Sequence, residues 1–275
     1  MFVCISLFVT TASARELKLA TWNLEWLTTR ERNLPQDVRP KRPEDIDLLQ
    51  RYAADLNADV IGIQEVDGAA VAARVFPPEQ YSIHMSHDHV VQRVGIVVRR
   101  GIHYDVNPDV TDLDVNPRGD LRSGVDITLQ LRPPLRVLAV HLKTGCFDDH
   151  LTRSKNRSCA ELRDQLSPLV DWIRARHAEG IAFAILGDFN RHMDGRDQFW
   201  RTLSEAAPLT RATEGRSSPC WSGEAFIDHV VLGDAARDWL EPNSLRVLTY
   251  RETSVEWKQR LSDHCPVSVR LRLPD

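Results

Sequence analysis

The sequence lacks the features that distinguish repeat proteins, low-complexity proteins and proteins of several linked domains. It contains no internal repeat, no low-complexity segment and no clear linker, so nothing divides it into separate domains. Its formal net charge is only −4, so the overall charge does not indicate a nucleic-acid-binding protein. A polyanionic substrate remains compatible with this balance, because a divalent cation and local arginine clusters can offset a mild negative charge. The hydrophobic content of 42% and the charged content of 27% are typical of a soluble globular protein.

Cysteine is scarce as well, with five residues in 275, and no compact His/Cys spacing indicates a zinc site. If Cys4 is removed with an export signal, four cysteines remain, an even number that suggests disulfides in an exported chain. Cys146 and Cys159 bracket one polar loop, so we expect them to pair, which leaves Cys220 for Cys265. In a cytosolic protein the same residues would instead be reduced core cysteines.

The sequence begins with a short apolar stretch over residues 1–14, too short to span a bilayer as a helix. It ends in Ala12-Ser13-Ala14, which fits the small residues of a cleavage site, although it lacks the positive residues that begin a signal peptide. We expect an export signal over 1–14, a mature domain over 15–275, and a periplasmic or secreted protein without stable membrane insertion. A buried first strand is the alternative.

Strands and helices alternate along the mature chain. Apolar runs and period-two alternation predict strands at 17–22, 59–63, 81–85, 94–98, 124–131, 135–141, 181–186, 226–232, 244–250 and 265–273. Helical spacing predicts helices at 44–56, 68–75, 160–177 and 196–203. The polar segments are expected to be loops or irregular, at 28–43, 102–120 and 146–159. This mixture indicates one α/β domain, expected to be monomeric.

Polar side chains stand where several of these strands end. The apolar run 181–186 ends at Gly187 and is followed by Asp188 and Asn190, which point the same way in an extended segment. A carboxylate and an amide at a strand end suit a hard cation or a phosphate, although an ordinary turn also favours these residues. Other strand ends carry similar groups, namely Asn23, Glu65, His141, Asp228, Asp263 and His264. Their joint occurrence predicts one site built from loops over a sheet.

The sequence around these residues resembles a known family. The motifs are Thr21-Trp22-Asn23, Gln64-Glu65, Gly187-Asp188-Phe189-Asn190, Ile227-Asp228-His229 and Ser262-Asp263-His264. In order and spacing they resemble those of the endonuclease/exonuclease/phosphatase superfamily, and His141 is similar to the histidine of its deoxyribonuclease I-like branch. The resemblance implies a four-layer sandwich, in which two packed mixed β-sheets are flanked by helices. It covers nearly the whole mature chain.

The resemblance also implies catalytic roles. Asp188 would orient or activate the attacking water, and Asn190 would hold a phosphate oxygen. His264 would act as a base or as a phosphate ligand, oriented by Asp228. His141 would bind the phosphate or protonate the leaving oxygen. Attack on a phosphodiester needs these functions, because the water must be positioned, charge neutralised and the leaving group assisted.

A metal site follows from the same resemblance. Glu65 would bind Mg²⁺, or alternatively Mn²⁺ or Ca²⁺, helped by Asn23 and Asp263. One strong carboxylate ligand is enough for Mg²⁺, because this cation keeps several of its waters.

Basic residues near the expected site favour a nucleic-acid substrate, most readily DNA. Arg122 resembles a phosphate-binding arginine of the same branch, and Lys143 and Arg93 are further candidates. The 146–159 loop adds Arg153, Lys155 and Arg157 at alternate positions, where they can track successive phosphates.

Three other functions remain open. A sphingomyelinase-like phosphodiesterase would expose apolar residues to a membrane, and the 146–159 loop offers only Phe147 and Leu151, which favours the polyanionic substrate. A phosphomonoesterase would use the same site. A catalytically inactive binding module would be expected to lose some of the motif residues, and here all of them are present.

Overall fold

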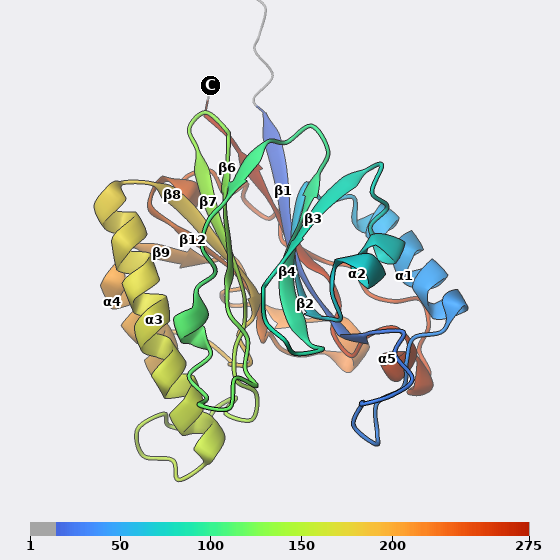
Figure 1. The fold of residues 1–275 in the computed structure, drawn as a ribbon. Helices are drawn as coiled ribbons and strands as arrows, with labels where there is room; N and C mark the ends of the chain where they lie inside the picture. Colours follow the sequence, from blue (N-terminus) through green and yellow to red (C-terminus); the bar gives the residue numbers. More distant parts are fainter. Residues whose placement is uncertain (1–14, 275) are drawn as a thin grey trace, which may run out of the picture.

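Two β-sheets of six strands each pack face to face, with helices on the outer faces (Figure 1). The computed structural model describes residues 15–274, so the expected export signal over 1–14 lies outside the described residues. The predicted four-layer α/β sandwich is confirmed. Among residues 15–274, no helix combines the length and the apolar character that a membrane span requires.

The first sheet has the strand order β13-β14-β1-β2-β4-β3, in which only β1 and β2 are parallel. Its strands are β1 (Glu16–Leu27), β2 (Val60–Val66), β3 (Tyr81–Met85), β4 (Arg93–Arg99), β13 (Arg246–Val247) and β14 (Val267–Arg272). The helices of this half are α1 (Pro43–Leu56), α2 (Ala69–Val75) and α5 (Glu256–Arg260).

The second sheet has the order β5-β6-β7-β8-β12-β9 and likewise one parallel pair, β7 with β8. Its strands are β5 (Tyr104–Val106), β6 (Val125–Leu129), β7 (Leu135–His141), β8 (Ala182–Asp188), β9 (Leu209–Arg211) and β12 (Asp228–Gly233). The outer face is covered by α3 (Arg157–Glu179) and α4 (Gln198–Ala206) (Figure 1). A separate two-stranded ribbon pairs β10 (Ser217–Ser218) with β11 (Glu224–Ala225).

Three apolar clusters fill the spaces between the four layers. The central one lies between the sheets and includes Leu19, Val60, Val137 and Leu186, all fully buried. The second packs β7 and β8 against α3 and α4, and the third packs β1 and β2 against α1 and α2. Burial of these side chains is the main force that holds the sheets and helices together.

The structure corrects the sequence prediction at two places. The segment 102–120 was expected to be irregular, yet its residues Tyr104–Val106 form the edge strand β5, which pairs with β6. The strand expected over 244–250 is limited to Arg246–Val247, because Tyr250 turns inward and uses its hydroxyl to bond the carbonyl of His264. Short edge strands carry too few alternating residues to be recognised from pattern alone.

Both expected disulfides are present, Cys146–Cys159 and Cys220–Cys265. The first closes the loop that follows β7. The buried guanidinium of Arg191 holds the same loop, since it donates to the carbonyls of Cys146 and Asp149 and pairs with Asp197 at 2.6 Å. No feature of the sequence indicated this role for Arg191, although it directly follows Asn190.

Replacing Cys146 and Cys159 together by alanine should lower the free energy of unfolding by about 3 kcal/mol, because the unfolded chain gains the freedom of an open loop. Urea unfolding of the oxidised proteins measures this loss. An unchanged unfolding midpoint would show that Arg191 and its partners hold the loop without the disulfide.

Candidate active site

The apolar rows of the inter-sheet core turn polar at one end of the sandwich. On β1 the row that contains Leu19 continues with Thr21 and Asn23, and on β8 the row that contains Leu186 continues with Asp188. All three polar side chains are buried. Strand periodicity thus carries hydrogen-bonding groups into the space between the sheets.

Strand register brings three predicted catalytic residues together. His141 at the end of β7 is aligned with Asp188 on β8, and Asp228 at the start of β12 pairs with the same Asp188. The glycine before Asp188 makes this approach possible, because a Cβ at Gly187 would lie 2.2 Å from the carbonyl oxygen of Val140. The motif therefore requires glycine at this position.

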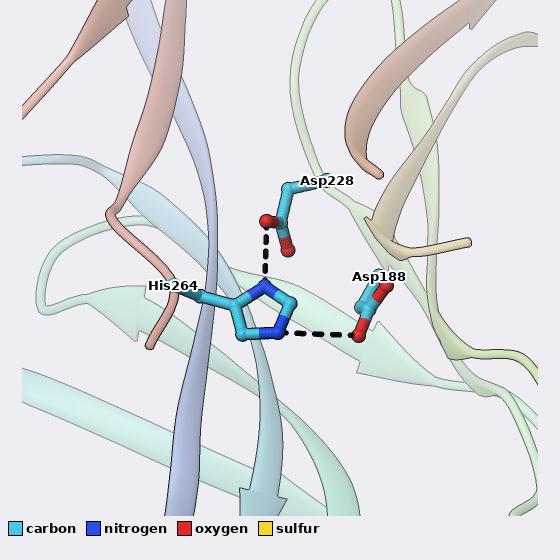
Figure 2. A group of neighbouring side chains, drawn as sticks. All are labelled: Asp188, Asp228 and His264. Atoms are coloured by element: carbon cyan, nitrogen blue, oxygen red, sulfur yellow. Dashed lines mark hydrogen bonds and ion pairs between the residues drawn. The ribbon is translucent and has the colours of Figure 1, made fainter. Parts of the chain in front are cut away.

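His264 lies between two carboxylates (Figure 2). Its Nδ1 is 2.7 Å from Oδ2 of Asp228, and its Nε2 is 3.8 Å from Oδ2 of Asp188. Although burial alone would lower it, the pKa of His264 is held well above its usual range by the negative charges of Asp228 and Asp188. Burial raises the pKa of Asp188 to about 7, and the neighbouring Asp228 adds to the rise. His264 is therefore an imidazolium at neutral pH.

The ligand atoms of Asp188, Asp228 and His264 lie within 4.8 Å of one another, close enough to hold a metal ion. The Nδ1 of His264 is already bonded to Asp228, so the three residues form a hydrogen-bonded Asp–His–Asp row as well as a possible cation site.

His141 has the opposite protonation state. Nη2 of Arg122 lies 2.8 Å from its Nδ1 and 3.0 Å from its Nε2, so the guanidinium rests against the imidazole ring. Burial and the charge of Arg122 lower the pKa of His141 well below its usual range. The neutral ring reaches toward Glu65 and Asp188, with its Nε2 3.6 Å from an oxygen of each.

Glu65 stands at the end of β2 in a strained conformation, with φ at +61°. Such a backbone costs free energy and is found mainly at functional sites. Its carboxylate accepts from Nδ2 of Asn23 at 3.3 Å and from the backbone N–H of Trp26 at 3.2 Å. The Asn23 amide also donates to Asp188, while its oxygen accepts from the N–H of Glu25. The Asn23 amide thus bridges the carboxylates of Glu65 and Asp188.

A second group of charges, which sequence analysis missed, borders Glu65. The partly buried Glu25 has a pKa raised to about 7, by burial and then by the charge of Asp263. Its carboxylate accepts from the N–H of Asp263 at 3.0 Å. The ammonium of Lys41 lies near these acids and donates to the carbonyl of Gln259 at 2.8 Å. Glu25 follows Asn23 by two residues, so strand alternation could have indicated it, whereas nothing local indicated Lys41.

These acids outnumber the permanent cations beside them. Two permanent cations, Lys41 and Arg122, lie near five carboxylates. The carboxylates are those of Glu25, Glu65, Asp188, Asp228 and Asp263. Crowded carboxylates repel one another, and the raised pKa values of Glu25 and Asp188 reflect this together with burial. Such an oxygen-rich set suits a hard divalent cation.

Asp188, two residues earlier in the chain, holds Asn190 in position. Its backbone N–H donates to Oδ1 of Asp188 at 2.8 Å, and its side-chain amide donates to Oδ2 and to the carbonyl of Leu142. Asn190 also has a positive φ of +50°. The loop after β8 is thereby fixed to the loop after β7.

Two residues outside the predicted set hold His264 against β1. The hydroxyl of Ser262 donates to the carbonyl of Asn23 at 2.7 Å and accepts from the N–H of His264. Tyr250 accepts from the indole of Trp22 and donates to the carbonyl of His264, both at 2.9 Å. Ser262 was visible within a motif, whereas Tyr250 gave no signal in the sequence.

The predicted substrate-binding residues are placed differently from one another. Arg122 lies within the site, as described. Lys143 lies beside it but has its ammonium 3.8 Å from Glu161 of α3. Arg93 has its guanidinium 3.8 Å from Asp67, so the prediction that it binds phosphate gains no support from this placement. Asp263, predicted as a metal ligand, has a half-exposed side chain 3.7 Å from His264.

Comparison with known proteins agrees with this geometry. A sequence model described as the endonuclease/exonuclease/phosphatase family matches residues 20–264. No curated protein matches the chain by sequence. Among solved structures, TDP2 from C. elegans is similar, with a TM-score of 0.62 and 15% identity over 94% of this chain and 75% of that one.

For two further solved structures, the match covers almost the whole of the solved chain. D. rerio TDP2, complexed with a single-strand DNA product, has a TM-score of 0.62 and 15% identity over 94% of this chain and 99% of its own. The 3'-5' exonuclease NExo from Neisseria meningitidis has a TM-score of 0.60 and 18% identity over 94% of this chain and 100% of its own. At these identities the likeness establishes the fold.

Proposed function

Because this chain belongs to the endonuclease/exonuclease/phosphatase family, whose members hydrolyse phosphoric esters, we propose that it is a divalent-metal-dependent phosphodiesterase that cleaves nucleic acid. The observation that carries the proposal is the row of Asp228, His264 and Asp188 beside the neutral His141 and Arg122. The row holds a base and an acidic imidazole side by side. Water attack on a phosphodiester requires both a proton acceptor and positive donors around the phosphate.

The pKa shifts of Asp188 and of the two histidines indicate which step of the reaction each side chain performs. Asp188 has a pKa near 7, so at neutral pH it can orient the attacking water and accept its proton. His264, an imidazolium held by Asp228, donates to a phosphate oxygen, which favours the phosphate-ligand role over that of the base. The neutral His141 binds the phosphate by a hydrogen bond rather than as a proton source, and Arg122 supplies fixed positive charge.

Glu65 is the residue that would hold the divalent cation, in a set completed by the oxygen-rich surroundings of Glu25 and Asp263. When bound, the cation neutralises charge on the phosphate and assists the leaving oxygen. Asn23 positions Glu65 and Asp188 through its amide nitrogen.

DNA is the proposed substrate. Two structural neighbours, D. rerio TDP2 and NExo, have been solved with a single-strand DNA product and with a product DNA hairpin, respectively. The loop that follows β7 carries Arg153 and Lys155, which are exposed, and leads to Arg157 at the start of α3. These cations can bind backbone phosphates without reading sequence. Location outside the cytoplasm is part of the proposal, supported by the two disulfides.

Changing Arg153, Lys155 and Arg157 together to glutamine should weaken DNA binding and flatten its dependence on salt, because fewer counterions are released. Arg157 already pairs with Glu161, so Arg153 and Lys155 should account for most of the change. Binding measured by fluorescence anisotropy across a salt series tests this, with Arg174→Gln on the outer helix α3 as the matched control.

Assays of the purified protein on plasmid DNA, RNA, sphingomyelin and a phosphomonoester test the function itself. DNA cleavage that requires Mg²⁺ or Mn²⁺ is expected. Hydrolysis of sphingomyelin or of the monoester without cleavage of any polynucleotide would replace the nuclease proposal. A lack of all four activities would favour an inactive binding module.

A further inference from the structure

A cavity of about 310 Å³ opens directly beside the catalytic histidine. Asp228 and His264 form part of its wall, and so does the Cys220–Cys265 disulfide. The remaining wall includes aromatic rings, Phe147, Trp221 and Phe226, and the ammonium-bearing Lys258. None of these four takes part in the hydrolysis described above. The volume is at the lower end of the range for small-ligand pockets, roughly 300–1,000 Å³.

The aromatic wall at Trp221 is rigid. The indole N–H donates to the carbonyl of Ser262 at 3.0 Å, and the ring packs against Tyr250 at 5.4 Å between centroids. The preceding residue, Cys220, is bonded to Cys265, which directly follows His264. Trp221 also has a positive φ of +50°, a strained conformation that these contacts maintain. The wall and the catalytic histidine are thus parts of one fixed unit.

Phe147 supplies an exposed aromatic face on the other loop. It is one of three large hydrophobic side chains exposed within residues 15–274, at 37%. Its ring stacks on that of His192, at 5.7 Å and 27°. His192 is itself held, through a bond from its N–H to the carbonyl of Phe147 and through Asp148 at 2.9 Å. A supported, solvent-exposed ring beside a phosphate site is the arrangement on which single-stranded bases stack.

We propose that this cavity, hereafter the base pocket, binds an unpaired nucleobase of the nucleotide that adjoins the scissile phosphate. This inference rests on the proposed function and specifies its substrate as single-stranded or unpaired DNA. The base stacks on Phe147 between apolar walls, while the phosphate lies at His264. Lys258, whose ammonium is 5.7 Å from the Trp221 ring centre, faces the next phosphate.

A paired base cannot enter such a pocket without leaving the helical stack. Extruding it costs free energy in a duplex and little in a single strand. The enzyme should therefore prefer single-stranded ends and loops over intact duplex. Phe147 is a specificity-determining residue in this proposal, not a catalytic one.

The test compares oligonucleotides that have or lack the base beside a single cleavable phosphate. In the control substrate, tetrahydrofuran replaces the nucleotide whose base would enter the pocket. The wild type should cleave the intact single strand with a KM roughly 10- to 100-fold lower than its KM for this control substrate. Tetrahydrofuran is placed 5′ of the phosphate in one substrate and 3′ in another. Phe147→Ala should abolish this preference and keep the wild-type rate on the strand that lacks the base, and Phe147→Trp should restore it.

A binding measurement without turnover separates stacking from catalysis. In EDTA, wild-type protein should quench the fluorescence of 2-aminopurine placed beside the phosphate, and Phe147→Ala should not. Val106→Ala, another exposed apolar residue on the edge strand β5, is the control and should behave as the wild type. Thermal unfolding verifies that the variants are folded.

The outcomes separate the two proposals. DNA cleavage that is insensitive to base removal, or a Phe147→Ala defect equal on both substrates, overturns the base pocket and leaves the nuclease function standing. A wild type that cleaves no polynucleotide overturns both.

Discussion

Substitution of His264 by alanine is expected to lower kcat by roughly 10²- to 10⁴-fold, the range that a group taking part in proton transfer or charge stabilisation contributes. The imidazolium lies 3.8 Å from Asp188 and is oriented by Asp228, so its loss removes the donor to the phosphate oxygen. Steady-state kinetics on a single-stranded oligonucleotide measure the loss. Asp188→Ala and Glu65→Ala should each cost a similar amount.

The fold should survive the change at His264, since the bonds from its backbone to Ser262 and Tyr250 do not use the side chain. Circular dichroism and thermal unfolding serve as the control. A His264→Ala variant with near-normal turnover would show that this histidine does not act on the reaction.

The pH profile distinguishes an acidic from a basic His264. If the imidazolium is the active form, the rate falls as pH rises through its pKa, which Asp228 and Asp188 hold well above the usual range. Asp228→Asn removes one of these charges, lowers the pKa of His264 and moves the alkaline limb to lower pH. A rate that instead rises as His264 loses its proton would identify it as the base.

Removal of divalent cations should abolish hydrolysis, which is the second large effect. Five carboxylates, Glu25, Glu65, Asp188, Asp228 and Asp263, crowd the site, so a phosphodiester that enters it meets negative charge that a bound divalent cation would offset. EDTA should stop the reaction, and Mg²⁺ or Mn²⁺ should restore it. Initial rates over a Mg²⁺ titration measure the effect.

Glu65→Gln is the sharper form of the experiment, because the amide keeps the shape of the side chain but loses its charge. It should raise the Mg²⁺ concentration for half-maximal activity, whereas Asp263→Asn, at a half-exposed position, should change it less. Binding of Mg²⁺ should also raise the melting temperature of the wild type more than that of Glu65→Gln. Full activity in EDTA would remove the metal from the proposal.

The sequence by itself determined the class of fold and most of the site. Alternation along β1 and a continuous apolar run along β8 identified these strands, and polar residues at their ends, Asn23 and Asp188, indicated the site. The motifs around these residues resemble those of the family to which the chain belongs. Spacing of Cys146 and Cys159 was enough to predict their bond. These features are local, so they can be read from neighbouring residues.

Tertiary structure alone decided the surroundings of each site residue, because its contacts join residues far apart in the chain. The pKa of His264 is raised and that of His141 is lowered, since one lies between two carboxylates and the other is buried against Arg122. The pairing of Arg93 with Asp67 likewise depends on the meeting of β2 and β4. Burial and charge around a side chain depend on what packs against it, and no local pattern specifies those neighbours.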